Sequence, residues 1–496
     1  MSEDSYKGIF KSTFLFSFVQ VIHIATKVVV NKVVSILLGA EGLGIISLYN
    51  SAINMLKSGC GLGIKQSAVR DVAEANKAGN TERIAEIISV TNKVVLFTAL
   101  LGLGVTIIGS PLLSKYSFGS AAYIIPFIIL SVAVALNVYA EGQMAILTGM
   151  RRLRDLAMAN IIGSVVGMLT SIPLYYLMGK DGIVPSLVIA ALCLFLVTKF
   201  YVGRIKISTV SLSFKEALKK AVPMVQMRSV LMVAGFAGLV FDVLVSSFIR
   251  YEGGFETVGY FQAGATIISG YFGIVLSAMT TDYYPRICGV NKDNVQLKNE
   301  LNKQVAAGII LIYPLAVCFV YLAPIFISFL YSDDFSVSTQ YTDLAIFGTL
   351  LTIASNCMGM IFMAKMESKL YLKLVLAALA SELCCYIPLY HFMGLRGLGI
   401  SYILMGVIGF SLYGFFLYKK YHIYLEKNII ALIAIAALAL VAAVLIRNIE
   451  NTVVNVMFAS MLIFLASTFS LLYLKIKMGI NIYAFIKNKI TKYNER

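Results

Sequence analysis

Residues 172–179 read Ile-Pro-Leu-Tyr-Tyr-Leu-Met-Gly, and residues 387–394, which stand 215 positions later, read Ile-Pro-Leu-Tyr-His-Phe-Met-Gly. Three further pairs of identical residues have the same offset: Gly182 with Gly397, Glu41 with Glu256, and Gly44 with Gly259. Separate stretches that agree on one offset without gaps are not expected by chance. The chain is therefore predicted to contain two copies of one structural unit.

The composition around this repeat is that of a membrane protein. Of the 496 residues, 59% are apolar and 13% are charged, and the mean hydropathy is +0.85. Because soluble proteins have about 25% charged residues, a water-soluble enzyme, a disordered chain and a coiled coil are excluded. Apolar runs long enough to cross a bilayer lie at 13–38, 43–64, 87–109, 121–148, 156–178, 182–203, 222–249, 257–280, 304–330, 340–364, 370–393, 397–418, 428–446 and 453–474. We expect an all-α polytopic membrane protein with about 14 transmembrane helices.

The basic residues indicate how these helices are oriented. The chain has 41 Lys and Arg against 25 Asp and Glu, a net charge of +16. With the N-terminus inside, 30 basic residues fall on the inner side and five on the outer side, namely Lys115, Lys180, Arg250, Arg396 and Arg447. Inner loops of membrane proteins are enriched in Lys and Arg, so both termini are predicted to be cytoplasmic. The charge indicates topology and attraction to anionic lipid rather than nucleic-acid binding.

The repeat and the apolar runs together predict the domain organisation. Residues 1–203 form an N-terminal six-helix bundle, and 204–221 form a cytoplasmic linker that is partly an amphipathic surface helix. Residues 222–420 form a second six-helix bundle, and 421–496 add two extra helices and a basic cytoplasmic tail. Because each repeat holds an even number of spans, the two bundles are parallel repeats around a central cavity, which suits alternating access.

Polar residues recur at helical spacing within four of the predicted spans. Placing an ionisable residue there costs about 2.5–3.5 kcal/mol, so each needs a physical reason. The stripes include Gln20, Lys27 and Asn31 in span one, with His23 beside them, Asn50, Asn54 and Lys57 in span two, Arg228 and Asp242 in span seven, and Gln262, Thr266 and Ser269 in span eight. Because they occupy equivalent positions in both repeats, we expect them to line the central cavity.

The cations of these stripes allow two interpretations. Lys27, Lys57 and Arg228 could present positive charge to an anionic substrate. Alternatively, Lys27 and Asp242, which correspond at the repeat offset, could form a buried structural ion pair. The two are compatible, since a pair that opens on binding would act as a switch. Two further acids within spans, Glu141 and Glu382, are candidates for interhelical hydrogen bonding or for coupling-ion binding.

The sequence offers few residues that could form a metal, catalytic or nucleotide-binding site. The seven cysteines lie in or beside apolar runs without metal-ligand spacing, and the chain has only three histidines. The cysteines are interpreted as buried thiols that act as small hydrophobes. No metal site and no catalytic residue are therefore predicted. No P-loop occurs, which excludes ATP hydrolysis by that route. No cleavable signal segment is expected before the first span.

Three stretches resemble a known family. They are residues 31–44 (Asn-Lys-Val-Val-Ser-Ile-Leu-Leu-Gly-Ala-Glu-Gly-Leu-Gly), residues 59–66 (Gly-Cys-Gly-Leu-Gly-Ile-Lys-Gln) and residues 147–152 (Leu-Thr-Gly-Met-Arg-Arg). Over about residues 10–420 the chain resembles bacterial O-antigen translocases, the Wzx-type flippases of polysaccharide biosynthesis. These belong to the superfamily of multidrug and oligosaccharidyl-lipid/polysaccharide exporters.

The resemblance implies a flippase of the bacterial cytoplasmic (inner) membrane. Its substrate would be an undecaprenyl-pyrophosphate-linked oligosaccharide, such as an O-antigen repeat unit of lipopolysaccharide, moved from the cytoplasmic to the periplasmic leaflet. Lys27, Lys57 and Arg228 would hold the pyrophosphate, and Asp242 would release Lys27 or couple transport to Na⁺ or H⁺. A polysaccharide polymerase and a chain-length regulator would be partners, and no other cofactor is expected. The extra spans at 428–446 and 453–474 resemble those of fourteen-span lipid II flippases.

Two other functions remain open. A cation-coupled exporter of drugs or other small molecules could have the same fold, but a carrier of organic cations is expected to have an acidic cavity. A membrane enzyme such as a polysaccharide polymerase or ligase is expected to place catalytic residues in a long outer loop. The longest outer gap here, 110–120, offers little such chemistry.

Overall fold

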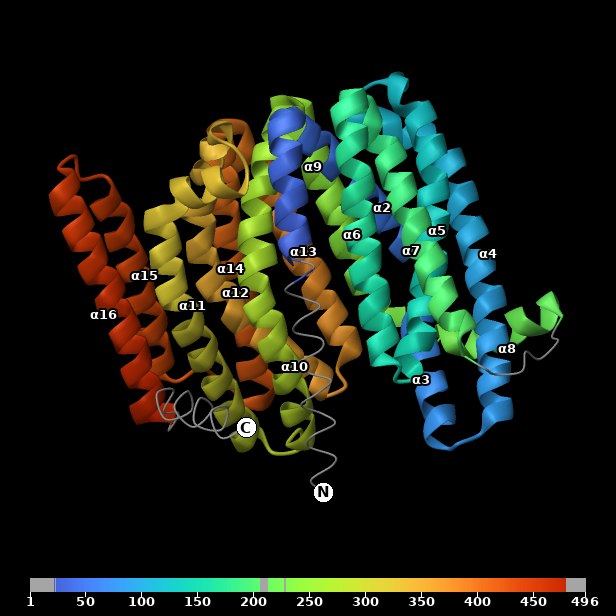
Figure 1. Cartoon of the computed structure of the whole chain (residues 1–496). Helices are drawn as coiled ribbons and strands as arrows, with labels where there is room; N and C mark the ends of the chain where they lie inside the picture. Colours follow the sequence, from blue (N-terminus) through green and yellow to red (C-terminus); the bar gives the residue numbers. More distant parts are fainter. Residues whose placement is uncertain (1–21, 23, 206–212, 227–228, 479–496) are drawn as a thin grey trace, which may run out of the picture. The chain divides into compact units, whose positions relative to one another are not determined.

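The computed structural model describes residues 22, 24–205, 213–226 and 229–478, and within these ranges all regular structure is helical (Figure 1). Ten helical segments of the described chain are long and apolar enough to cross a membrane. The all-α polytopic membrane fold is thereby confirmed. Helix α2 (Gly39–Cys60) is not among the ten, because its polar stripe lowers its hydropathy. The number fourteen stays a prediction.

The chain divides into two compact units, which are described separately. The first unit comprises residues 1–259 and 330–332. Its described helices are a helix at 24–37, α2 (Gly39–Cys60), α3 (Ile64–Lys77), α4 (Thr81–Leu113), α5 (Ile124–Gly149), α6 (Leu153–Met178), α7 (Ile183–Gly203), α8 (Phe214–Gln226) and α9 (Ser229–Ala265) up to Gly259. The π-helix η1 (Ser114–Phe118) and the short 3-10 helices η2 (Ala121–Tyr123) and η3 (Gly179–Gly182) connect some of them.

The second unit comprises residues 260–329 and 333–496. It holds the end of α9, the π-helix η4 (Thr266–Phe272), α10 (Gly273–Gly289), α11 (Asn294–Leu330) up to Phe329, the 3-10 helix η5 (Asp333–Ser338), α12 (Thr339–Ala364), α13 (Ser368–Met393), α14 (Leu395–Tyr421), α15 (Lys427–Arg447) and α16 (Thr452–Met478). The boundary between the units falls within α9. The predicted boundaries at 203, 221 and 420 stay predictions about the repeats.

The internal repeat is visible in the backbone. Helices α5 and α12 begin and end at an offset of 215 residues, and so do α6 and α13. The same offset relates three pairs of residues with left-handed φ angles: Gly39 (68°) with Gly254 (75°), Arg151 (54°) with Met366 (60°), and Gly179 (58°) with Gly394 (58°). Because such angles are uncommon outside glycine, their recurrence shows that the two repeats share helix boundaries and turns.

Within the first unit, the two repeats meet at paired glycines. A Cβ atom on Gly44 would collide with the backbone oxygen of Phe255, and one on Gly259 would collide with that of Ala40. Ala40 and Phe255 also correspond at the repeat offset, so the contact is reciprocal. Here α2 and α9 approach backbone to backbone, which only residues without a side chain allow.

We expect Gly44→Ala and Gly259→Ala each to destabilise the protein by about 1–3 kcal/mol, because an added methyl group overpacks this contact. The measurement is the apparent Tm of the detergent-purified protein, from the monodisperse fraction that survives heating. Gly104→Ala in α4 is the control, since a Cβ there meets no atom within 4 Å. Equal Tm values for Gly44→Ala and Gly104→Ala would contradict the prediction.

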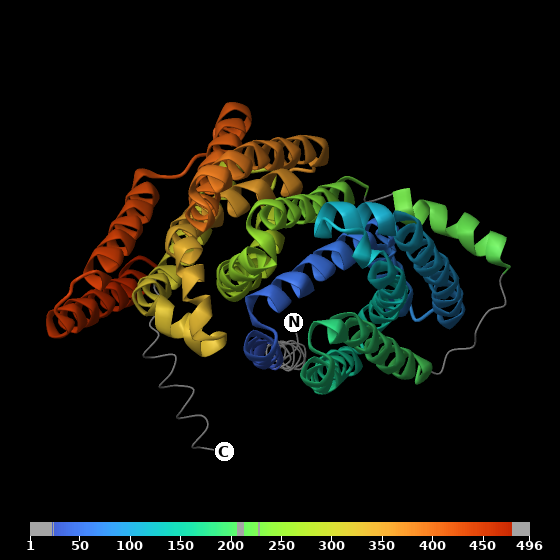
Figure 2. The ribbon, with the colours of Figure 1, turned by 90° about the horizontal axis from the view of Figure 1, so that it is seen from above.

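The linker was predicted to contain an amphipathic surface helix, and α8 occupies its second half. A capping box begins the helix: Ser213 N–H donates to Glu216 Oε2 (2.8 Å), and Glu216 N–H donates to Ser213 Oγ (3.2 Å). Lys220 forms an ion pair with Glu86, and Phe214 packs its ring edge-on against Phe97. Helix α8 thus lies across the long axis of α4 (Figures 1 and 2).

The extra helices α15 and α16 are attached to the second unit by polar contacts. Arg447, in the last turn of α15, donates from Nη1 to Asp343 Oδ1 (2.9 Å) and to the Val320 oxygen (2.9 Å), and its Nη2 pairs with Asp343 Oδ2. Ser470 Oγ of α16 donates to the Ile310 oxygen at 2.6 Å. A guanidinium that binds both oxygens of one carboxylate in this way forms a strong, directional contact.

Arg447→Ala is expected to lower the free energy of unfolding by about 2–3 kcal/mol. Breaking a fully buried pair costs about 3–5 kcal/mol, and here the side chains of Arg447 and Asp343 remain 21% and 17% exposed. The same measurement of apparent Tm tests the expected loss of stability in Arg447→Ala. Lys303→Ala, which removes an exposed pair with Glu300, serves as the control and should cost about 0–1 kcal/mol. A loss no larger than that of the control would refute the prediction.

Candidate functional site

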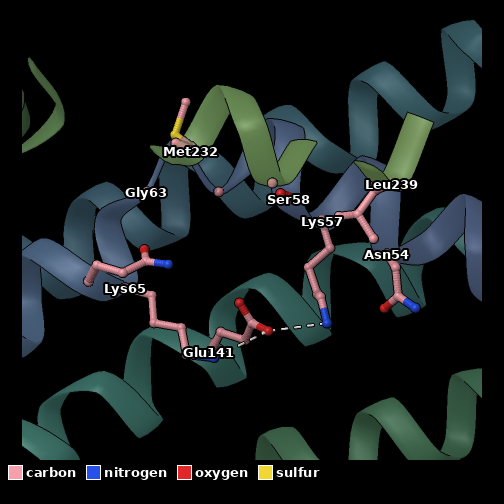
Figure 3. Close-up of a pocket in the computed structure, with 11 residues that line it drawn as sticks. Asn54, Lys57, Ser58, Gly63, Lys65, Glu141, Met232 and Leu239 are labelled. Atoms are coloured by element: carbon pink, nitrogen blue, oxygen red, sulfur yellow. Dashed lines mark ion pairs between the residues drawn. The ribbon is translucent and has the colours of Figure 1, made fainter. Parts of the chain in front are cut away.

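A charged cavity of about 380 Å³ lies within the first unit, between α2, the start of α3, α5 and α9 (Figure 3). Its size falls in the range of ligand pockets, about 300–1,000 Å³. The lining residues are Asn54, Lys57, Ser58, Gly61, Gly63, Lys65, Gln66, Glu141, Met232, Gly235 and Leu239. Charged and amide groups from α2, α3 and α5 therefore face a partly apolar wall from α9.

The local backbone explains why two lysines share this cavity. Asn54 and Lys57 are three residues apart on α2 and so lie on one helix face. Helix α2 ends at Cys60, and Leu62 (φ 48°) and Gly63 (φ 68°) then adopt left-handed conformations before α3 begins at Ile64. This sharp turn returns Lys65 to the cavity. Gly63, with its positive φ, bends the chain at this turn.

Glu141 of α5 lies between the two lysines. Its Oε1 is 3.1 Å from Lys57 Nζ and 3.7 Å from Lys65 Nζ (Figure 3). The side chains of Lys57 and Glu141 are 25% and 28% exposed, and that of Lys65 is 48% exposed. Two cations and one anion leave these three groups with a charge of +1. The cavity therefore carries unbalanced positive charge that an incoming anion can reach.

The structure places other predicted residues of the first unit outside this cavity. Asn50 is exposed on α2, and Asn31 Nδ2 donates to the Tyr331 hydroxyl at 3.3 Å. Lys27, in the helix at 24–37, and Asp242, in α9, are both exposed. Within the described chain, these two residues form no ion pair with each other or with another residue. The cavity instead holds the charge pair Lys57–Glu141.

The remaining candidates lie in the second unit or outside the described residues. Gln262 Nε2 of α9 donates to Thr266 Oγ1 of η4 at 3.2 Å, and Thr266 is buried. Glu382 is buried in α13, at 4% exposure. Gln20, His23 and Arg228 fall outside the described residues. The described chain holds no group of three or more His, Cys, Asp or Glu residues that could bind a metal ion.

Sequence reasoning missed Lys65 and Gln66 as cavity residues. Lys65 counted only as one of the basic residues of an inner loop. The signal that could have found it is the Gly61-Leu62-Gly63 turn directly after the Lys57 stripe. A helix that stops at such a turn and restarts after Gly63 returns the next side chains toward the preceding helix end.

Comparison with known proteins assigns the chain to a protein family. The family model described as "Polysaccharide biosynthesis protein" matches residues 33–340, more than half of the chain. The chain belongs to this family. It is also 21% identical over 368 residues to the lipid III flippase of Escherichia coli (strain K12), covering 71% of this chain and 84% of that protein. The expected link to polysaccharide biosynthesis is confirmed at the level of the family.

Solved structures confirm the fold. The lipid II flippase MurJ, in an inward closed conformation, superposes with a TM-score of 0.69 at 15% identity, over 94% of this chain and 99% of that one. A multidrug-resistance MATE transporter of the MOP superfamily, in an inward-facing conformation, gives a TM-score of 0.63 at 16% identity, over 83% and 95% of the two chains. The family member described here therefore has the multi-pass helical fold of MOP-superfamily transporters.

Proposed function

We propose that this protein is a flippase that moves a lipid-linked oligosaccharide across the bacterial cytoplasmic membrane. The observation that carries this proposal is the surplus positive charge at Lys57, Lys65 and Glu141, held inside a multi-pass protein of a polysaccharide biosynthesis family. A glycan carried on a lipid by a pyrophosphate is large, polar and anionic. It needs a wet path and a cationic contact to leave the headgroup region, and the relative named a lipid III flippase supports this kind of cargo.

The ion pair offers a way to bind and release the anion. At 3.1 Å, Lys57 and Glu141 attract each other by about 5 kcal/mol before desolvation, with an effective dielectric constant of about 20. A pyrophosphate carries about two negative charges, so it competes with the single carboxylate for Lys57 and Lys65. Glu141 then becomes free to bind Na⁺ or a proton. When the anion leaves, Glu141 pairs with Lys57 again, and the re-formed ion pair prevents the anion from binding again.

The finer assignment follows from the family resemblance. We propose an undecaprenyl-pyrophosphate-linked repeat unit of the O-antigen type as the substrate, moved from the cytoplasmic to the periplasmic leaflet by alternating access, with both termini cytoplasmic. Lys27 and Arg228 are retained as further candidate contacts of the pyrophosphate, and Asp242 as a candidate coupling group. A polysaccharide polymerase and a chain-length regulator would act on the product at the outer leaflet.

The cellular test is restoration of surface glycan. Cells that lack the native gene should display glycan again when the wild-type protein is supplied, with its level measured by immunoblot. Export of organic cations from the same cells is measured in parallel. Restored cation export without restored glycan would favour a drug exporter of the same fold and overturn the proposal.

A further inference from the structure

A second cavity, of about 370 Å³, lies within the second unit between η4, the start of α10, α12, α13 and α14. None of its fourteen lining residues is charged. They combine hydroxyl groups, a carboxamide, tyrosine rings and methionines, among them Ser269, Thr352, Asn356, Tyr371 and Tyr413. Its chemistry is thus polar but neutral, unlike that of the charged cavity.

The two cavities share part of their lining at equivalent positions of the two repeats. Asn54, Ser58 and Glu141 of the charged cavity correspond, at the offset of 215, to Ser269, Gly273 and Asn356 of the neutral one. At the same offset Lys57 corresponds to Phe272. The second repeat thus keeps the cavity and replaces the ion pair with an aromatic ring and a carboxamide. One copy suits an anion, and the other suits an uncharged polar ligand.

The polar groups of the neutral cavity can accept and donate hydrogen bonds. Ser355 Oγ donates to the Leu351 oxygen at 3.0 Å, and as a hydroxyl oxygen it can also accept a hydrogen bond. The Asn356 side chain is exposed, and within the described chain it makes no hydrogen bond. Its amide can therefore donate to a ligand while its carbonyl accepts.

The rings of Tyr371 and Tyr413 line the cavity next to Gly359. A Cβ on Gly359 would lie 3.6 Å from Tyr371 Cε2 and 3.7 Å from Tyr413 Cζ, an ordinary van der Waals distance. Because Gly359 has no side chain, the space between these rings stays open. A sugar ring has an apolar face of C–H groups and an edge of hydroxyl groups. Tyrosines and a free carboxamide in one cavity match both features.

We propose that this neutral cavity is a carbohydrate subsite that binds one or more sugar residues of the lipid-linked glycan. The inference rests on the proposed flippase function and assigns the glycan and the pyrophosphate to different repeats. A volume of about 370 Å³ is at the small end of ligand pockets, which suits a mono- or disaccharide. An acyl chain is a poorer match, because it would leave the Asn356 carboxamide without a partner.

The test compares two probes on the full-length protein in detergent. One is undecaprenyl pyrophosphate, and the other is the undecaprenyl-pyrophosphate-linked oligosaccharide isolated from cells that carry the gene. The variants are Asn356→Leu, which removes the carboxamide at similar size, and Gly359→Leu, which fills the space between the tyrosines. Gly104→Ala in α4 is the control, because it lies outside both cavities and its Cβ meets no atom within 4 Å.

We expect Asn356→Leu and Gly359→Leu to weaken binding of the glycan-bearing lipid by about tenfold, which corresponds to about 1.4 kcal/mol. Binding of undecaprenyl pyrophosphate should be unchanged, which also shows that the variants are folded. Gly104→Ala should bind both probes like the wild type. Lys57→Ala should instead weaken binding of both probes.

Three results would overturn the subsite. Unchanged binding of the glycan-bearing lipid by both leucine variants would place the sugar elsewhere and leave the proposed function intact. Equal weakening for both probes would show that the cavity holds the lipid or supports the fold. A wild-type protein that binds neither probe would overturn the proposed function together with the subsite.

Discussion

Lys57→Ala is expected to lower surface glycan display at least tenfold while the protein accumulates at its normal level. A hydrogen bond to a charged group contributes about 1.5–3 kcal/mol, or about ten- to a hundredfold in affinity. Protein level should be unaffected, because Lys57 and Glu141 are about a quarter exposed and Lys65 still faces Glu141. Glycan display and an immunoblot of the membrane fraction measure the two quantities.

The control for Lys57→Ala is Lys303→Ala, which also removes a lysine paired with a glutamate, but on an exposed surface. It should leave display unchanged. The double variant Lys57→Ala/Glu141→Ala separates a substrate contact from a structural pair. If the double variant restored both protein level and display, Lys57 would serve the fold and the substrate assignment would be wrong.

Glu141→Gln is expected to act in the opposite direction on binding. Removing this carboxylate raises the charge of the three groups from +1 to +2 and ends its competition for Lys57. We therefore expect undecaprenyl pyrophosphate to bind about five- to tenfold more tightly, a gain of about 1–1.4 kcal/mol. Transport should fall several-fold, because the lysines no longer have a partner that helps to displace the anion. Binding in detergent and glycan display measure the two effects.

Glu82→Gln, which changes an exposed acid in the first turn of α4, should alter neither quantity. A Glu141→Gln protein that bound the lipid more weakly would show that the carboxylate only orders the lysines. The competition described above would then be wrong.

Most of the fold could be predicted, because long apolar runs and a gap-free repeat leave few alternatives. The run at 121–148 corresponds to α5 (Ile124–Gly149), and that at 156–178 corresponds to α6 (Leu153–Met178). The boundaries differ where polar residues continue a helix. Helix α4 begins at Thr81 rather than 87, because Asn80 caps it by accepting from Arg83 N–H at 2.9 Å.

The connection between the seventh and eighth predicted spans was more difficult to predict. Residues 250–256 were expected to be a loop, and instead two helical segments of α9 meet there at a kink, where Gly254 has a non-helical backbone (φ 75°, ψ −179°). Arg250 is held there by hydrogen bonds to the oxygens of Ser117 (3.1 Å) and Tyr116 (3.2 Å). These contacts come from a distant part of the chain, so no local sequence pattern predicts them. The repeat does relate Gly254 to the left-handed Gly39.

The site was predictable along each helix but not between helices. Helical spacing placed Asn54 and Lys57 on one face, and the cost of a buried charge singled out Glu141. Which helix faces α2 depends on packing, so the Lys57–Glu141 pair could not be derived from spacing. Lys27 and Asp242 correspond at the repeat offset, yet correspondence in a repeat does not bring two side chains into contact.

The most direct test uses purified protein in liposomes with a fluorescent undecaprenyl-pyrophosphate-linked oligosaccharide. Transfer between leaflets is followed by quenching from outside, for the wild type, Lys57→Ala and Lys303→Ala. We predict rapid transfer by the wild type and Lys303→Ala, and a rate at least about tenfold lower for Lys57→Ala. Transfer by the wild type at the rate of protein-free liposomes, or equal rates for all three proteins, would contradict the flippase function or the role of its charged cavity.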